Sequence, residues 1–497
     1  MKVKTRFAPS PTGFLHIGGV RTALYSYALA RKHNGKFILR IEDTDKKREV
    51  EGGVQNIIDM LNILGLEYDE GPIVGGPNGP YIQSKRLKIY QKKAEKLVED
   101  GKAYYCFCSE DRLEKLRKKQ IKEKKQPMYD KKCRDLDPEE ARTRIEKGEE
   151  YVIRLKIPQN KTLSIDDAVM GHVEWNSNDV DDQVLLKSDG FPTYHLGVVV
   201  DDVLMGVTHI TRGIEWLASV PKHLVLFDAF GIEPPVMAHM PVILDPDGGK
   251  LSKRKGTVST EEFLKEGYLP EALLNFLMLL GWSAPLEREY GEKEREFFSL
   301  EDFVELFSLE ELNKASPVFN RDKLIWFNHK YINNLSPDDF VIEYTKWLNK
   351  YSEDENLKNE IIEKGPDYLE TILELVHERV ELLSEISDLI YNFYFKPETK
   401  EIEKILKEHK HTKKLKEKEI QKIISEFSVE LNEQTSIKNW GHDNWESCIR
   451  DIAKKLDIKA GQAFMTLRIL TLGSPISPPL FESMEVLGKD EVAERLK

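Results

Sequence analysis

VKTRFAPSPTGFLHIGGVRTALYSYALARK, residues 3–32, contains in turn the pattern of a strand, a loop and a helix. The segment Val3–Ala8 predicts a short strand, and the prolines and the glycine that follow it predict a loop. From Ile17 to Lys32, apolar residues recur at helical spacing. Phe37–Glu42 (FILRIE) predicts a second strand, which ends in an acidic turn. This alternation of strand and helix favours a parallel sheet with crossover helices.

Further helices are predicted over Asn56–Leu64 and Leu87–Val98, and the alternation then breaks. The stretch between Tyr104 and Gln183 holds three of the four cysteines, a lysine-rich run and short β-like pieces such as Tyr151–Ile157, so we expect an inserted domain there. Strand-like apolar runs resume at Val184–Leu186, Leu196–Val200 and Pro241–Leu244.

The last third of the chain has a different composition. After Asp322, glycine and proline become rare, while Glu, Lys, Leu and Ile recur at helical spacing, as in Leu369–Ile390 and Ile402–Ile424. We therefore predict an all-α C-terminal region.

Composition excludes several classes of protein. With 74 Lys and Arg against 86 Asp and Glu, the formal net charge is −12, which excludes a uniformly basic nucleic-acid binder but not a local basic face. Four cysteines in 497 residues are too few for a disulfide scaffold. The longest apolar stretch, Leu273–Trp282, is far shorter than the roughly 20 residues of a membrane span, and the N-terminus has no signal-peptide core. We expect a cytoplasmic, monomeric protein of about three domains that does not bind membranes.

Two loops have the composition of phosphate-binding sites. Gly18 and Gly19 stand at the start of the first predicted helix, whose free N–H groups favour an anion, and His16 lies beside them. Residues 245–256, DPDGGKLSKRKG, combine glycines with four basic side chains that can follow a moving pyrophosphate. Taken alone, the first motif is also compatible with a simple helix cap, and the second with a solvated basic loop.

Together the two loops resemble the signatures of class I aminoacyl-tRNA synthetases. His16–Gly19 (HIGG) resembles their HIGH motif, and Lys250–Arg254 (KLSKR) resembles their KMSKS motif. Six further segments, in the same order, resemble the bacterial glutamyl-tRNA synthetases: TRFAPSPTG, LRIEDTD, DEGP, FPTYHL, EWL and HMP. The resemblance covers nearly the whole chain.

The resemblance implies an α/β Rossmann-type catalytic domain with an inserted α+β domain, followed by an all-α C-terminal anticodon-binding region. The implied boundaries are 1–104 and 184–250 for the two halves of the catalytic domain, 105–183 for the inserted acceptor-end-binding domain, 251–321 for a stem-contact region, and 322–497 for the helical region, with a division near residue 375.

The resemblance also implies a two-step reaction. Glutamate's α-carboxylate attacks the α-phosphorus of ATP, which is bound with Mg²⁺, and the terminal ribose of tRNA(Glu) then attacks the acyl carbon of the glutamyl-adenylate. Whether tRNA(Gln) is also charged stays open. His16, Lys250 and Lys253 are the implied catalytic residues. The implied ATP-binding set is His16, Gly18, Gly19, Lys250, Ser252 and Lys253.

Glutamate carries two carboxylates and one ammonium, so its pocket needs two cations and one anion. By resemblance, Arg6 and Arg212 are the cations, since a guanidinium can clamp a carboxylate with two hydrogen bonds, and Glu42 is the anion. Ala8, Ser10 and Tyr194 complete the implied glutamate-binding set. The family usually has Asn at the position of Val198 and an acidic residue at that of Ile214, so this pocket departs from the pattern at two places.

Two further sites follow from the resemblance. Some relatives bind zinc with Cys-x-Cys-x24-Cys-x-His, and this chain has Cys106, Cys108 and Cys133 with Asp135 at the fourth position. A structural Zn²⁺ site and reduced cysteines left from a lost site both stay open. The implied tRNA-binding residues are Arg48, Glu215, Trp216 and Arg379.

Four alternative functions fit the sequence less well. A glutaminyl-tRNA synthetase would end in β-barrels, whereas this C-terminus is predicted to be helical. A truncated paralogue that modifies a tRNA base, or a small-molecule nucleotidyltransferase, would not need the last third. A non-catalytic tRNA-binding protein would not need His16, Glu42, Lys250 and Lys253 together.

Overall fold

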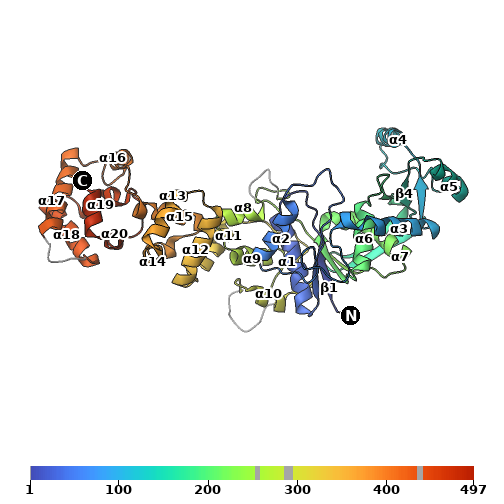
Figure 1. Ribbon diagram of the computed structural model, residues 1–497, viewed down its shortest axis with the longest axis horizontal. Helices are drawn as coiled ribbons and strands as arrows, with labels where there is room; N and C mark the ends of the chain where they lie inside the picture. Colours follow the sequence, from blue (N-terminus) through green and yellow to red (C-terminus); the bar gives the residue numbers. More distant parts are fainter. Residues whose placement is uncertain (1, 252–257, 285–294, 434–439) are drawn as a thin grey trace. The chain divides into compact units, whose positions relative to one another are not determined.

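The computed structural model describes residues 2–251, 258–284, 295–433 and 440–497 (Figure 1). The chain forms two compact units. Unit 1 comprises Met1–Glu262 and Leu273–Asn320, and unit 2 comprises Phe263–Ala272 and Arg321–Lys497. The segment 273–320, predicted as part of a stem-contact region, thus belongs to the same unit as the parallel strands.

The parallel sheet is built as the sequence predicts. Strand β1 (Lys4–Phe7) pairs in parallel with β2 (Lys36–Leu39), and helix α1 (Ile17–Lys32) connects them. Strand β8 (His209–Gly213) pairs in parallel with β9 (Val236–Met240). These strands are short and almost fully buried, as is typical of parallel strands covered by helices.

A backbone hydrogen bond joins the two strand pairs. The Thr208 N–H, one residue before β8, donates to the Lys4 carbonyl at the start of β1 (2.9 Å). Strands β1 and β8 therefore lie side by side, and their carboxyl ends open toward the same edge.

Between the two parallel pairs the chain forms antiparallel structure. One sheet has the order β3–β4–β7, and a separate hairpin pairs β5 with β6. The strands are β3 (Ala103–Cys106), β4 (Val152–Leu155), β5 (Thr162–Asp167), β6 (Gly171–Asn176) and β7 (Val184–Leu186). The predicted strand Val184–Leu186 is confirmed, and it pairs with β4 rather than with a parallel strand.

Unit 1 contains further helices, several of which pack against these sheets (Figure 1). They are α2 (Gly53–Ile63), α3 (Leu87–Glu99), α4 (Glu110–Lys122), α5 (Pro138–Glu146), α6 (Tyr194–Leu204), α7 (Val220–Ala229) and α10 (Leu300–Leu306), with 3₁₀ turns at Gln83–Arg86, Ser177–Asp179 and Ile214–Ser219. Where the chain passes between the units it forms α8 (Thr260–Lys265) and α9 (Pro270–Met278).

Every regular element described in unit 2 beyond residue 320 is helical. The helices are α11 (Arg321–Asn333), α12 (Pro337–Tyr351), α13 (Glu355–Lys364), α14 (Pro366–Glu374), α15 (Leu383–Tyr394), α16 (Thr399–Glu408), α17 (Glu417–Glu433), α18 (His442–Lys455), α19 (Ala460–Leu472) and α20 (Leu480–Arg495), with a 3₁₀ turn at His377–Arg379. Their apolar faces, including Trp445 and Phe427, form one continuous core. The predicted all-α region is confirmed.

Two local predictions were wrong. Leu196–Val200 is part of helix α6 and not a strand, because a short apolar run that is buried all round does not distinguish the two. The predicted strand Pro241–Leu244 lies after β9, which ends at Met240, where the proline lacks the N–H that a ladder needs. The helical patterns Leu369–Ile390 and Ile402–Ile424 are confirmed, and each spans two α-helices.

Candidate functional site

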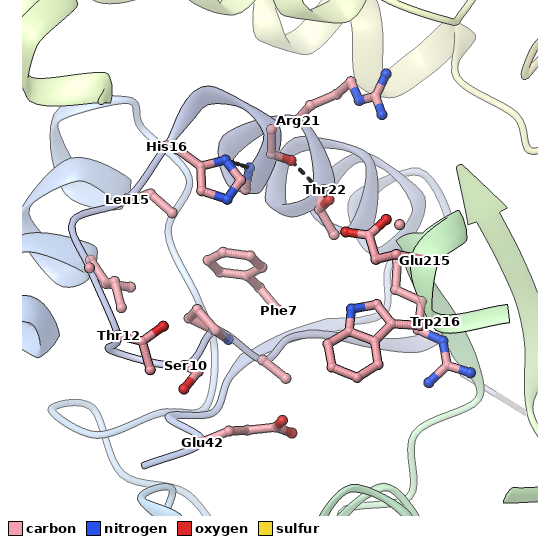
Figure 2. A pocket seen from close by; sticks show the side chains of 18 of the residues that line it. Phe7, Ser10, Thr12, Leu15, His16, Arg21, Thr22, Glu42, Glu215 and Trp216 are labelled. Carbon is pink, nitrogen blue, oxygen red and sulfur yellow. Dashed lines mark hydrogen bonds between the residues drawn. The ribbon is translucent and has the colours of Figure 1, made fainter. Parts of the chain in front are cut away.

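One cavity of unit 1, about 630 Å³, opens where β1, β2 and β8 end and α1 begins. Figure 2 shows His16 and Glu42 at opposite ends of it in this view, with Phe7 between them. The cavity brings together most of the residues that the sequence singled out: Arg6, Ala8, Ser10, His16, Gly18, Gly19, Glu42, Arg48, Tyr194, Arg212, Glu215, Trp216 and Lys250. The predicted residues Ser252 and Lys253 lie outside the described residues.

The start of α1 supplies backbone N–H groups at one end of the cavity. His16 is the N-cap, and its Nδ1 accepts a hydrogen bond from the Gly19 N–H (3.1 Å; Figure 2). Since Nδ1 accepts, the ring proton of neutral His16 lies on Nε2, where it can be donated to an anion. A Cβ at residue 19 would lie 2.9 Å from the Leu15 side chain, and the first turn carries no acidic residue. This end can therefore accept a phosphate.

The residues that follow the second signature loop lie beside the first loop, although about 240 residues separate them in sequence. The Ile17 N–H donates to the Val258 carbonyl (3.0 Å), and the Thr260 N–H donates to the Leu15 carbonyl (2.9 Å). Lys250 lines the same cavity, and its Nζ lies 3.6 Å from Oε1 of Glu215. Lys250 therefore shares a cavity with the start of α1, and the described residues 258–260 lie directly beside it.

Arg6 and Glu42 belong to a buried charge network that the sequence did not predict. Arg6 Nε donates to Asp202 Oδ1 (3.2 Å), which also accepts from Arg40 Nη1 (2.7 Å). Arg40 Nη2 in turn donates to Glu42 Oε1 (2.9 Å). Burial raises the pKa of Glu42, against the opposing effect of Arg40. Two guanidinium groups and two carboxylates are thus held rigidly at the carboxyl ends of β1 and β2.

Arg212 differs from Arg6 in its partners. Its Nε donates to His239 Nε2 (2.9 Å) and its Nη1 donates to the Tyr194 hydroxyl (3.2 Å). His223 Nδ1 lies 3.4 Å from Nη1. Nη2 is buried and has no hydrogen-bond partner among the described residues. Burial lowers the pKa of Arg212. The hydrogen-bond partners named above are all uncharged, so the cavity holds a cation that they do not neutralise.

Aromatic and histidine side chains surround this cation. Tyr194 and Trp216 stack with ring centroids 4.2 Å apart, and burial raises the pKa of Tyr194 to about 12, so its hydroxyl stays protonated at neutral pH. Val198 also lines the cavity and is buried. Ile214, the other departure from the family pattern, starts the 3₁₀ turn after β8.

Arg48, one of the four predicted tRNA-contacting residues, sits at the mouth of the cavity. It is largely exposed and paired with Asp45 (2.6 Å). Arg379 lies in unit 2, in the turn His377–Arg379, and its Nη1 donates to the Ser477 carbonyl (3.3 Å).

Three cysteines converge at the edge of the β3–β4–β7 sheet. Cys106, Cys108 and Cys133 each offer a sulfur, and these atoms lie within 4.8 Å of one another. The Tyr129 hydroxyl lies 3.4 Å from the sulfurs of Cys106 and Cys108. The thiolate-capable sulfurs fit a zinc ion, which prefers such ligands in a tetrahedral arrangement. Asp135 is not part of the cluster: its side chain is 85% exposed and its carboxylate lies 3.6 Å from Lys156 Nζ.

Sequence reasoning missed four buried residues that support the side chains lining the cavity. Arg40, Asp167, Asp202 and His239 are buried, and each contacts a residue of the cavity or its direct partner. The only local signal was their position at the ends of apolar segments, where buried charge is unusual. None of the described helices has both the length and the apolar character that crossing a membrane requires.

Comparison with known proteins agrees with this geometry. The family described as tRNA synthetases class I (E and Q), catalytic domain, matches residues 2–326, and the anticodon binding domain family matches 341–497. A glutamate–tRNA ligase of Chlorobium luteolum is 43% identical over 505 residues, which cover 100% of this chain and 97% of the relative. One of Treponema denticola is 42% identical over 514 residues, covering 100% and 99%.

Solved structures give the same result. The crystal structure of a glutamate tRNA ligase from Elizabethkingia meningosepticum in complex with its amino acid has a TM-score of 0.80 and 32% identity, covering 100% of this chain and 98% of that one. The glutamate-tRNA synthetase from Elizabethkingia anophelis has a TM-score of 0.81 and 33% identity, covering 100% and 99%. With its Rossmann-type catalytic region and all-helical C-terminal region, the chain belongs to the class I tRNA synthetases of the E and Q family.

Proposed function

We propose that the chain ligates L-glutamate to tRNA(Glu) with ATP, and that the cavity of unit 1 is where glutamyl-adenylate forms and is consumed. The observation that carries the proposal is the convergence, in one cavity, of three groups: a buried Arg212 whose Nη2 has no hydrogen-bond partner among the described residues, a buried Glu42, and the N-terminus of α1. Those groups match the carboxylate, the ammonium and the phosphate that the reaction brings together.

Glutamate would occupy the end of the cavity lined by β1, β2 and β8. Arg6 and Arg212 would each hold one carboxylate, because burying an unpaired carboxylate costs several kcal/mol. Glu42 would accept the α-ammonium, with Tyr194 adding a hydroxyl and with Ala8 and Ser10 forming the wall. Val198 supplies no hydrogen bond, so recognition would depend mainly on the two arginines and the tyrosine.

ATP would lie with its phosphates at the start of α1. His16 and the N–H groups near Gly18 and Gly19 would donate to the phosphoryl oxygens, while Lys250, Ser252 and Lys253 would follow the departing pyrophosphate. Mg²⁺ bound to the ATP phosphates would neutralise charge there. An α-carboxylate oxygen of glutamate attacks the α-phosphorus as the bond to pyrophosphate breaks. The ribose hydroxyl then attacks the acyl carbon and AMP leaves.

The tRNA would extend from this cavity. We assign residues 105–183 to the acceptor end, 251–321 to the stem, and 322–497, with Arg379, to the anticodon. Arg48, Glu215 and Trp216 would contact the acceptor end at the mouth of the cavity. The proposal includes a cytoplasmic, monomeric protein, in keeping with four cysteines that form no disulfide.

The cysteine cluster would hold a structural zinc ion. Cys106, Cys108 and Cys133 would be three ligands, and the position of the Tyr129 hydroxyl makes its oxygen the candidate for the fourth. Bound zinc would tie β3 to the loop that carries Tyr129 and Cys133, and it would take no part in the chemistry at the cavity.

Charging assays with purified tRNA(Glu) and tRNA(Gln), each with glutamate and with glutamine, test the proposed function. We expect ATP-dependent formation of glutamyl-tRNA(Glu). Preferential attachment of glutamine, or no attachment of either amino acid, would contradict the proposal. The result with tRNA(Gln) and glutamate decides whether the enzyme is restricted to one tRNA.

A further inference from the structure

The Arg212 guanidinium is the first member of a buried chain of three residues. Arg212 on β8 and His239 on β9 are direct partners in the parallel register. Arg212 Nε donates to His239 Nε2 (2.9 Å), and His239 Nδ1 lies 2.5 Å from Asp167 Oδ2. The exposed fractions of the three residues are 5%, 0% and 3% in that order.

The hydrogen-bond chemistry of this chain allows a single arrangement of protons when the imidazole is neutral. A guanidinium has only donors, so His239 Nε2 must present its lone pair to Arg212, and its proton must lie on Nδ1. Nδ1–H then donates to Asp167, which has to be an ionised acceptor. Burial opposes the charge of Asp167, but hydrogen bonds from His239 and Met170 outweigh it and hold the pKa of the carboxyl below its ordinary value.

The backbone fixes Asp167 as firmly as the side chains do. Its Oδ1 accepts from the N–H groups of Val169 (3.0 Å), Met170 (2.9 Å) and His239 (3.2 Å). The Ala168 N–H also donates to the Met237 carbonyl on β9 (2.8 Å). The tip of the β5–β6 hairpin, 72 residues before His239, is thereby fastened to the strand that faces Arg212.

We propose that Asp167 and His239 are positioning residues of the amino-acid pocket: Asp167 fixes His239 as the Nδ1–H tautomer, and His239 then holds the Arg212 guanidinium by Nε, so that Nη2, which is left without a partner by the part of the chain described, can bind a substrate carboxylate. The proposal rests on the proposed function, because the carboxylate is that of glutamate.

The arrangement has a physical advantage over a direct ion pair. A carboxylate in contact with Arg212 would occupy the guanidinium donors and offset its charge, as Asp202 does for Arg6. Here the groups that contact Arg212 are His239, His223 and the Tyr194 hydroxyl, all acceptors without charge in the neutral state. Asp167 therefore orients the cation through the imidazole and leaves its charge to the ligand.

Asp167→Asn is the sharpest test because it is nearly isosteric. The amide oxygen can still accept the three backbone N–H groups, but the amide NH₂ faces His239 Nδ1 and donates to it. The imidazole proton then moves to Nε2, where it opposes Arg212 Nε–H, and a buried donor is left unpaired. We expect KM for glutamate in tRNA charging to rise roughly 10- to 100-fold with KM for ATP nearly unchanged, and the unpaired buried donor should lower the melting temperature.

Asp59→Asn, the same substitution at an exposed position on α2, is the control. The Asp59 carboxylate accepts a hydrogen bond from Gln55 and lies outside the proposed binding sites, so we expect wild-type kinetics. If wild type and this control charge tRNA normally and Asp167→Asn does so with KM for glutamate within twofold of theirs, the positioning proposal fails while the proposed function stands. If wild type itself does not charge tRNA with glutamate, the proposed function fails.

A second pair of variants decides the matter even if Asp167→Asn does not fold. His239→Gln offers an amide oxygen near the place of Nε2, whereas His239→Leu offers no acceptor. We expect the Leu variant to raise KM for glutamate at least tenfold and the Gln variant to recover most of that loss. Equal KM values for the two variants, or a loss confined to kcat and melting temperature, would overturn the proposal.

Discussion

Replacing Arg212 with glutamine should separate substrate binding from folding stability. The guanidinium is 5% exposed, contacts only uncharged acceptors, and has an Nη2 without a partner among the described residues. The charge-assisted hydrogen bonds that Nη2 can donate to a carboxylate, each contributing about 1.5–3 kcal/mol, would be lost with it. We expect a loss of about 3 kcal/mol of transition-state binding, which is a roughly 100- to 200-fold fall in kcat/KM for glutamate.

The same substitution should not destabilise the protein. Burial lowers the pKa of Arg212, which means that the folded state disfavours its charge. Replacing a buried cation that lacks a carboxylate partner with a neutral side chain removes that cost, so the free energy of unfolding should stay constant or rise. Removal of a cation that merely stabilised the fold would have the opposite effect.

Steady-state charging across glutamate and ATP concentrations measures the kinetic effect, and urea unfolding measures stability. Lys96→Gln, which removes an exposed cation on α3, is the control and should match wild type in both. The ratio of glutamate charging to glutamine charging shows which carboxylate Arg212 binds. Both amino acids have the α-carboxylate, so the ratio falls only if Arg212 binds the side-chain carboxylate of glutamate. Glutamate kinetics within threefold of wild type would refute the assignment of Arg212 to the amino-acid pocket.

Three further outcomes are expected. Lys253→Ala should slow single-turnover adenylate formation, measured with tRNA present, by roughly a hundredfold or more, as for loss of a preorganised donor; a rate within threefold of wild type would exclude Lys253 from the mechanism. Elemental analysis of protein purified without chelator should give about one zinc per chain, and Cys133→Ser should lose it; a metal-free, fully active wild type would exclude the zinc site. Burial lowers the pKa of His195 to about 3 and lowers those of His223 and His239, so each takes up its proton mainly on unfolding. The free energy of unfolding should therefore decrease as the pH falls through the unfolded pKa of about 6.5, by about 0.7 kcal/mol for each histidine between pH 7 and 6. In urea titrations, His195→Gln should reduce this pH dependence by one third. A free energy of unfolding that does not change with pH would contradict the burial of neutral imidazoles.

Local sequence patterns were sufficient to predict the strand and helix that form the phosphate-binding end of the cavity. The strand Lys4–Phe7, the helix Ile17–Lys32 and the helical last third follow from apolar periodicity, because a helix or strand with one buried face must repeat that face in its sequence. The same reasoning was wrong for Leu196–Val200, since a segment buried on all sides loses its periodicity. The cavity-lining residues from Arg6 to Lys250 were found by motif, and all of those that are described line one cavity.

What only the tertiary structure decided is which groups touch across long sequence distances. The sequence treats Arg6 and Arg212 alike, yet the fold gives Arg6 a carboxylate partner and gives Arg212 only uncharged ones. Asp167 contacts His239 because the β5–β6 hairpin packs against β9. Asp135 lies outside the cysteine cluster, with its side chain exposed to solvent. Motifs and periodicity report residue type and local face, whereas hydrogen-bond partners depend on strand register and packing, which no local pattern encodes.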